Sequence, residues 1–85
     1  MSEDIELLKK KIVYKSSYRG IKELDIILRS FVSKHLNKLN LEELYDLIDF
    51  LDNNDEDIYK FKQGIKIKKK IKNNNITNLF RNFEI

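Results

Sequence analysis

The sequence has no cysteine, no proline and a single histidine, His35. Without cysteine the chain can form neither a disulfide nor a thiolate metal site, and it lacks a thiol nucleophile. A metal site normally needs several imidazole, thiolate or convergent carboxylate ligands, so the lone histidine disfavours a metalloenzyme. The composition therefore excludes disulfide-stapled folds and gives no support to metal catalysis.

Glycine is also scarce, with only Gly20 and Gly64. Glycine and proline are the usual turn residues between the strands of sheet proteins. Their scarcity predicts an all-α fold in which helix caps mark the ends of the helices. The 85 residues suffice for one hydrophobic core but not for two, so we expect a single domain over residues 1–85. No apolar run is long enough to cross a membrane. The start of the chain, MSEDIELLKKK, is typical of neither a secretory signal nor a transit peptide.

Apolar residues recur every three or four positions in the first half of the chain, as on one face of an amphipathic helix. We predict a first helix that Ser2 caps and that runs to about Tyr18. A second helix starts near Ile21 and has His35 at its polar end. The apolar stripes are Ile5, Leu8 and Ile12 in the first helix and Ile21, Leu24, Leu28 and Phe31 in the second.

Caps and turn residues mark the helices of the second half. Asn40 followed by Glu43 is a capping box and predicts a third helix. The turn DNND leads into a short fourth helix that closes at Gly64. Residues 65–75 are predicted to be a linker, after which the NNN run caps a short last helix. The inward-facing residues are Leu41, Leu44, Ile48 and Leu51 in the third helix, Ile58 and Phe61 in the fourth, and Ile76, Leu79, Phe80 and Phe83 in the last.

Three groups of residues could carry chemistry, and each has a simpler structural interpretation. His35 could act as a general base, but its place at a helix end favours a cationic cap. Asp52, Asp55 and Asp57 could bind a cation, but they lack the spacing of a calcium loop and suit a capped turn. The lysine runs KKK and KIKKKIK suggest nucleic-acid binding, which a net charge of only +3 makes the weaker hypothesis.

The segment YRGIKELD, residues 18–25, carries the strongest functional signal. Gly20 stands between the first two helices, where it can end one helix with positive φ or let another backbone approach closely. Arg19 and Glu23 are one turn apart and could form a surface ion pair, but such a pair contributes only about 0–1 kcal/mol. Stability alone therefore gives little reason for these residues to occur together. The guanidinium of Arg19, the backbone of Gly20 and the carboxylate of Glu23 together predict a surface that recognises a partner.

RGIKELD resembles the R-G-x-x-E-L-D signature of the succinate dehydrogenase flavinylation factor family, small proteins that assist covalent attachment of FAD to the flavoprotein subunit. The resemblance covers residues 8–64. KKIVYKSSYRGIKELDIILRSFVSKHL is similar to the family's first two helices, and LEELYDLIDFLDNNDEDIYKF to a later leucine-rich helix with its acidic turn. The resemblance implies a compact bundle of about five helices. The chain departs from the family pattern at Asp52, at Phe61 and in IKIKKKIKNNN, which has no close counterpart.

The resemblance also implies a partner and a mechanism. The partner is the flavoprotein subunit of succinate dehydrogenase or of fumarate reductase, in which the flavin becomes bonded to a histidine. Because the flavin carries the hard chemistry, the chain is expected to be no enzyme and to bind no cofactor stably. We expect Arg19, Gly20 and Glu23 to bind the client, with Tyr18 and Asp25 as further contacts. Arg19 would bind a carboxylate or polar backbone, Gly20 would permit close approach, and Glu23 would orient Arg19 or accept a donor.

Two other functions remain open at this point. An antitoxin that neutralises a toxin would also be a binding protein, and a small basic nucleic-acid-binding protein would use the lysine runs. The assembly factor is the hypothesis we favour, as a monomer with no nucleic acid and no membrane insertion. We expect it to be located in the cytoplasm of a bacterium.

Overall fold

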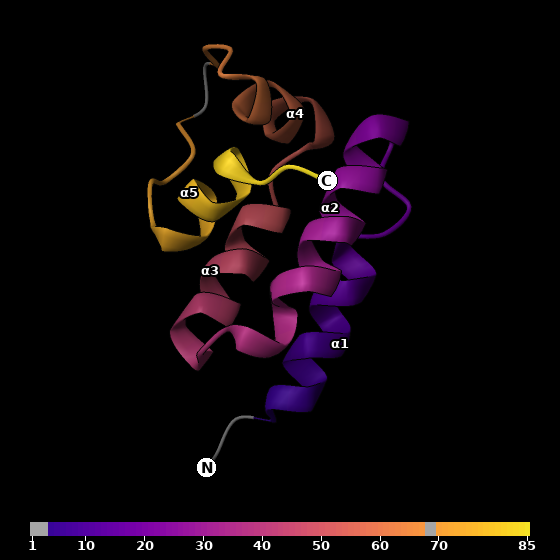
Figure 1. Ribbon diagram of the computed structural model, residues 1–85, viewed down its shortest axis with the longest axis vertical. Coiled ribbons are helices and arrows are strands. Elements are labelled where there is room, and N and C mark those ends of the chain that lie inside the picture. Colours follow the sequence, from indigo (N-terminus) through magenta and orange to yellow (C-terminus); the bar gives the residue numbers. More distant parts are fainter. Residues whose placement is uncertain (1–3, 68–69) are drawn as a thin grey trace.

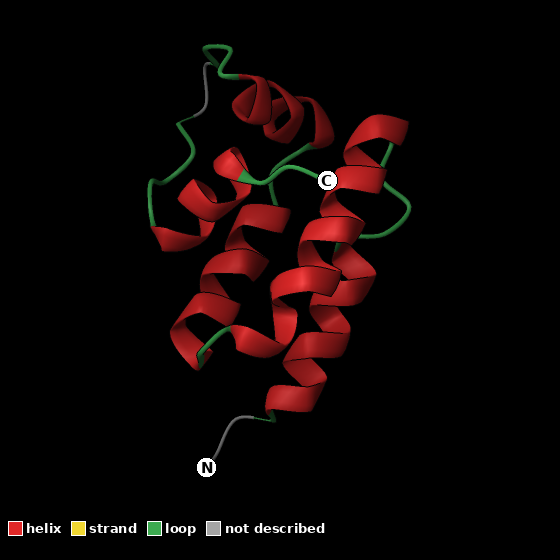
Figure 2. Cartoon of the chain, in the orientation of Figure 1, coloured by secondary structure: helices red, strands yellow, loops and turns green. Residues whose placement is uncertain are grey.

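The computed structural model describes residues 4–67 and 70–85, and within these the chain forms only helices and loops (Figures 1 and 2). The elements are α1 (Ile5–Lys15), α2 (Lys22–His35), the 3-10 helix η1 (Leu36–Lys38), α3 (Leu41–Leu51), α4 (Asp55–Gln63) and α5 (Asn75–Asn82). The prediction of an all-α bundle of about five helices is confirmed.

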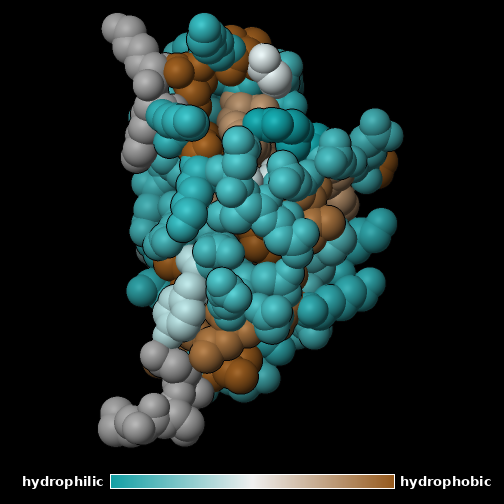
Figure 3. All heavy atoms as spheres, turned by 90° about the vertical axis from the view of Figure 1, so that its left-hand side faces the viewer, coloured by the Kyte–Doolittle hydropathy of each residue, from teal (hydrophilic) through white to brown (hydrophobic). Residues whose placement is uncertain are grey.

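The molecule measures 40 × 23 × 20 Å. Helices α1, α2 and α3 form its long body (Figure 1). α1 packs mainly against α3, and α2 runs beside α1 in the opposite direction. α4 lies across the upper end of this body, and α5 packs against α3 and α4. The side of the molecule that carries α3 and α5 is mostly hydrophilic (Figure 3). None of the helices formed by the described residues has both the length and the apolar character needed to cross a bilayer.

One continuous core receives side chains from every α-helix. Fully buried members are Ile12 of α1, Leu24, Leu28 and Phe31 of α2, Leu44 and Leu47 of α3, Ile58 of α4, and Ile76 and Phe80 of α5. Aromatic rings join the last helix to the others, since the Phe80 ring lies 5.4 Å from that of Phe31 and 5.2 Å from that of Phe50. Edge-on and tilted pairs at such distances add about 0.5–1.5 kcal/mol each to the gain from burial.

Asparagine side chains start three of the helices, as predicted for the third and the last helix but not for the fourth. Asn40 and Glu43 form a reciprocal capping box at α3, and Asn74 forms another with Thr77 at α5. Asn54 caps α4 by accepting the Asp57 backbone N–H, and that helix closes at Gly64, whose φ of 76° is left-handed. A side-chain cap of this kind stabilises a helix by about 1 kcal/mol, which explains how a chain without proline separates its helices.

The first helix is shorter than predicted. α1 ends at Lys15 rather than near Tyr18, because the hydroxyls of Ser16 and Ser17 both donate to the Val13 carbonyl oxygen. Serine side chains that bond to the backbone in this way compete with helix continuation. The backbone then turns at Tyr18, whose φ is 57°.

Two further predictions about helix ends need revision. Ser2, the predicted cap of the first helix, lies outside the described residues, and α1 is capped by Asp4. The His35 ring packs 4.8 Å from the Phe31 ring and 5.8 Å from the Phe83 ring. Burial, followed by the charges of Lys34 and Lys38, lowers its pKa. A cationic cap at His35 is therefore disfavoured.

The predicted linker has no helix or strand among its described residues before α5 begins at Asn75. It is nevertheless attached to the core, because Ile71 is 7% exposed and belongs to the buried cluster. Ile67 is partly buried and also packs against this cluster, so the described part of the linker lies against the core between α4 and α5.

Candidate functional site

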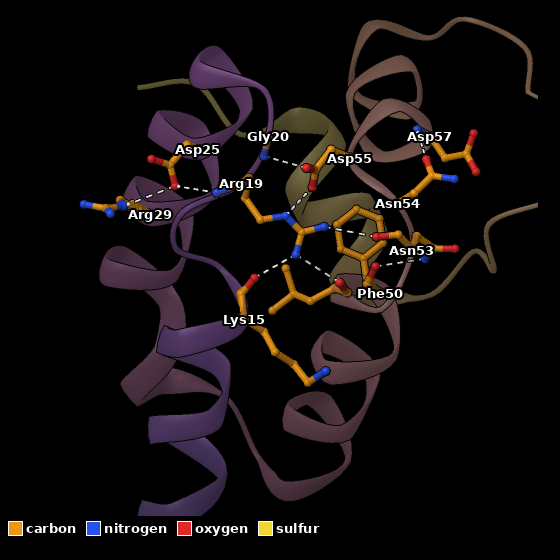
Figure 4. A network of polar contacts seen from close by, with 11 residues as sticks. Lys15, Arg19, Gly20, Asp25, Arg29, Phe50, Asn53, Asn54, Asp55 and Asp57 are labelled. Atoms are coloured by element: carbon orange, nitrogen blue, oxygen red, sulfur yellow. Dashed lines mark hydrogen bonds and ion pairs between the residues drawn. The ribbon is translucent and has the colours of Figure 1, made fainter.

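The signature segment lies where two loops meet. Residues 16–21 connect α1 to α2, and the turn at residues 52–54 connects α3 to α4. Figure 4 shows the Arg19 side chain between these two loops, with its guanidinium pointing toward Asp55 and the turn. We call this region the Arg19 corner.

Arg19 holds the corner together through its side chain, which is 11% exposed. Its Nε donates to Asp55 Oδ1 at 2.5 Å. Nη1 donates to the carbonyl oxygens of Lys15 at 2.7 Å and Leu51 at 3.1 Å, and Nη2 donates to that of Asn53 at 3.0 Å. Charge-assisted bonds of this type are the strong ones in proteins, and here they join the ends of α1 and α3 to the start of α4.

Asp55 bonds to both Arg19 and Gly20, the first two residues of the signature. Its other oxygen, Oδ2, accepts the Gly20 backbone N–H at 2.6 Å (Figure 4). A Cβ atom on residue 20 would lie only 2.8 Å from Oδ2, a distance that forces the carboxylate to move. The positive-φ glycine among the described residues is Gly64 and not Gly20. Glycine at position 20 is thus explained by the close approach of the Asp55 carboxylate of the same chain. We call Arg19, Gly20 and Asp55 together the Asp55 latch.

Glu23 and Asp25 support the corner from α2. Glu23 does not pair with Arg19; its Oε2 accepts the Tyr59 hydroxyl at 2.5 Å, and this hydrogen bond is the main cause of a raised pKa for Tyr59. Asp25 Oδ1 accepts the Arg19 backbone N–H at 3.4 Å and also pairs with Arg29 Nε at 3.3 Å. The expected orientation of Arg19 by Glu23 is therefore wrong, since Asp55 performs it.

Tyr18 is the predicted site residue that presents an aromatic ring to solvent. Its ring is 85% exposed and lies under the Arg29 guanidinium, 5.1 Å from the ring centroid. A left-handed φ costs an ordinary residue about 1–2 kcal/mol relative to glycine. Tyr18 therefore presents its ring to solvent at a cost in backbone conformational energy.

A shallow groove of about 440 Å³ opens beside the latch. Tyr14, which is 77% exposed, and Tyr18 lie along it, and Lys15 and Asp52 form an ion pair within it. We call it the corner groove. Tyrosine is enriched in protein interfaces because it combines a large apolar ring with a polar end. This chemistry suits adhesion to another protein surface.

The acidic turn has structural roles in place of the cation site that was considered. Asp52 pairs with Lys15, Asp55 with Arg19, and the Asp57 backbone N–H bonds to Asn54. Across residues 4–67 and 70–85, no three histidine, aspartate or glutamate side chains gather closely enough to hold a metal ion. The interpretation as a capped turn is confirmed.

The structure gathers Tyr18, Arg19, Gly20 and Asp25 at one corner and adds a residue that sequence reasoning missed. Asp55 was interpreted as part of a capped acidic turn, with a cation site as the alternative. Its separation of 36 residues from Arg19 left no local pattern that would connect the two. The hint in the sequence was the excess of acids after the turn, since Glu23 already offered a nearby partner for Arg19.

Comparison with protein families gives one match, to a family described as flavinator of succinate dehydrogenase, over residues 10–84. The matched segment contains the Arg19 corner and every residue of the latch. No solved structure shows significant similarity to the chain.

Several curated relatives are named succinate dehydrogenase assembly factor 2, mitochondrial. The protein from Aspergillus flavus is 42% identical over 57 residues, which cover 67% of this chain and 20% of the relative. For Saccharomyces cerevisiae the identity is 38% over 58 residues, covering 68% and 36%, and for Aedes aegypti it is 33% over 67 residues, covering 76% and 42%. The chain thus matches between about a fifth and two fifths of the length of these relatives.

These names overturn one expectation. The relatives are eukaryotic and are named as mitochondrial, so the expectation of a bacterial cytoplasmic protein is wrong. The expectation rested on the start of the sequence, which matches neither a secretory signal nor a transit peptide.

Proposed function

The chain belongs to the family of flavinators of succinate dehydrogenase, and from this premise we propose that it binds the flavoprotein subunit of succinate dehydrogenase and promotes covalent attachment of FAD to a histidine of that subunit. The observation that carries the proposal is the family match over residues 10–84. The names of the relatives favour this role over that of an antitoxin or a nucleic-acid binder, and they favour the mitochondrion as its place of action.

The Arg19 corner is the proposed docking surface. Its buried side chains hold the two loops together, and its exposed residues contact the client. Arg19 and Asp55 lie mostly inside, where they hold the two loops in one arrangement. Gly20 is exposed and lets the client backbone approach, while the rings of Tyr14 and Tyr18 offer contact area along the corner groove. The latch thus keeps the docking surface in shape before the client arrives.

The proposed mechanism is selection of one client conformation. The flavin and the client histidine carry out bond formation, so the chain acts as a chaperone-like factor without a catalytic group. If the chain binds the attachment-competent arrangement of the immature subunit more tightly, that arrangement becomes more populated. A preference of about 1.4 kcal/mol raises its population ratio about tenfold.

The test measures how much flavin is covalently attached to the client after the client has been denatured. Purified apo flavoprotein subunit is incubated with FAD, with or without this chain, and in-gel flavin fluorescence is measured after denaturation. We expect a faster rise in fluorescence with the chain present. Equal rates with and without the chain would remove the proposed function.

A matched pair of variants locates the docking surface. Tyr18→Ala removes an exposed ring from the corner, whereas Tyr45→Ala alters a tyrosine on α3, away from the corner, that is 39% exposed. The Tyr18 variant should lower the rate of flavin attachment and the Tyr45 variant should leave it near the unmodified value. A similar loss in both would show that docking lies elsewhere on the molecule.

A further inference from the structure

A second groove runs along the seam between α1 and α2. It consists of two adjoining hollows of about 430 and 290 Å³, and both are lined by Val13, Leu36 and Asn37. The shared lining makes them one continuous depression, which we call the α1–α2 groove.

The floor of this groove is apolar and accessible. Val13 is 48% exposed although it faces a neighbouring helix, and Leu36 is half-buried beside the well-buried Val32. Accessible apolar surface that is recessed between helices is a common feature of sites for protein segments. The groove can therefore accept an apolar side chain from outside.

Positive charge exceeds negative charge around the floor, with Lys9, Lys10 and Arg29 against Glu6 among the lining residues. Lys9 and Lys10 line one end, and neither makes an ion pair with any described residue. Glu6 is the acid that lines the same end, and Arg29 at the other end is shared with Asp25 at 3.3 Å. A ligand with carboxylates would supply the missing counter-charge.

The uneven distribution of charge along the chain supports this interpretation. Residues 4–38, which form α1, α2 and η1, contain nine lysines and arginines against four acids. Residues 39–64, which form α3 and α4, contain eight acids against two lysines. The groove thus lies in the basic part of the molecule, where an acidic partner is attracted over a distance of about 10 Å at moderate salt.

We propose that the α1–α2 groove binds an acidic segment of the client flavoprotein, with an apolar side chain over Val13 and Leu36 and carboxylates facing Lys9 and Lys10. The proposal rests on the proposed function for the identity of the client. Ser17 lines both this groove and the corner groove, so one client can cover the two surfaces together. A flat membrane surface would not reach a floor recessed between two helices.

Binding of the purified apo flavoprotein subunit is the test, measured by titration calorimetry at low and high salt. The charge variant is Lys9→Glu with Lys10→Glu, and the floor variant is Val13→Asp. Lys66→Glu with Lys70→Glu is the control, since it makes the same change of charge at exposed lysines outside the groove. We expect both groove variants to weaken binding about tenfold or more at low salt, with no change in the control.

Salt separates the two groove variants. At 0.5 M salt the loss caused by charge reversal should shrink, because screening removes the attraction from the unmodified protein as well. The loss caused by Val13→Asp should persist, because it changes an apolar contact. Thermal melts by circular dichroism show whether each variant is folded. If Val13→Asp is unstable, the variant Lys9→Glu with Lys10→Glu still tests the groove, because it changes side chains outside the buried core.

The outcomes distinguish this inference from the proposed function. If the unmodified chain binds the client and both groove variants bind equally well, the groove is not a docking site and the proposed function stands. If the unmodified chain does not bind the client, both fail. If light scattering shows a dimer that charge reversal dissociates, a second copy with its acidic α3 is the occupant, and the inference is overturned.

Discussion

At the scale of the residue, the Asp55 carboxylate gives the signature glycine a physical reason. It bonds to both Arg19 Nε and the Gly20 N–H, and it leaves 2.8 Å for any Cβ on residue 20. A larger residue at this position would therefore push out the group that orients Arg19. Because the latch is intramolecular, substitution of Gly20 perturbs folding and docking together and does not test docking by itself.

A double-mutant cycle tests the latch. Gly20→Ala should destabilise the otherwise unmodified chain by about 1–3 kcal/mol through overpacking against Asp55. After Asp55→Ala, which itself should cost about 2 kcal/mol for the lost charged bonds, adding Gly20→Ala should cost almost nothing. Urea unfolding followed by circular dichroism at about 10 °C, near maximal stability, measures the four free energies.

Gly64→Ala is the control for this cycle. Nothing lies within 4 Å of a Cβ there, and the position is strained only by its φ of 76°. It should cost about 1–2 kcal/mol whether or not Asp55 is present. Equal costs of Gly20→Ala in both backgrounds would mean that Asp55 does not explain the glycine.

Tyr18 allows stability to be separated from docking. Tyr18→Gly removes the left-handed strain at φ 57° but also removes the ring beneath Arg29. The first effect should stabilise by about 1 kcal/mol and the second should cost about 0.5 kcal/mol. The melting temperature should therefore stay equal or rise while flavin attachment to the client slows. A fall in both would identify Tyr18 as a structural residue only.

At the scale of the element, helix ends in this chain are decided by short-range chemistry. Asn40, Asn54 and Asn74 each cap a helix within three residues of their own position. Ser16 and Ser17 end α1 early by bonding to the carbonyl one turn back. The caps at Asn40 and in the asparagine run before α5 were predicted from sequence. The caps at Asp4 and Asn54 and the competition between serine and the helix at the end of α1 were not.

The end of α2 should give the protein a pH dependence. The pKa of His35 is lowered by burial and by two lysines, so the unfolded chain binds a proton more readily. Stability should fall as pH drops below about 6.5, the unfolded value, and the loss is complete below the lowered folded value.

His35→Phe removes the titrating group and keeps an aromatic ring in the cluster. The difference in melting temperature between pH 7.5 and pH 5 should be smaller in this variant than in the unmodified chain. Carboxylates titrate in both proteins, so their contribution cancels in the comparison. An unchanged difference would show that His35 titrates alike in the folded and unfolded states.

At the scale of the whole molecule, the last 21 residues complete the core. Ile71, Ile76 and Phe80 are all buried, and Phe80 contacts rings of α2 and α3. Small domains have little stability to spare, of the order of 3–5 kcal/mol from a single core. The segment after Gly64 is therefore as necessary to folding as the matched signature.

Truncation after Gly64 tests this dependence. The shortened chain should keep much of its helical circular dichroism but lose cooperative thermal unfolding and bind a hydrophobic dye. Phe80→Ala should cost about 3–5 kcal/mol, which is enough to unfold most of a domain of this size. A cooperative melt of the truncated chain near that of the full chain would show that α5 is an accessory element.

The sequence alone determined the properties that depend on neighbours along the chain. The all-α class, the capping boxes, the closing glycine of α4 and the signature from Arg19 to Asp25 all follow from spacings of a few residues. The family followed from that same local signature, which the match over residues 10–84 confirms.

Only the tertiary structure decided which distant groups meet. The latch joins residues 36 positions apart, Glu23 meets Tyr59 at the same separation, and the α1–α2 groove requires two packed helices. A carboxylate can satisfy an arginine from any part of the chain, so sequence spacing does not select one partner among many. Packing selects it, because only the folded bundle brings the start of α4 to the loop between α1 and α2.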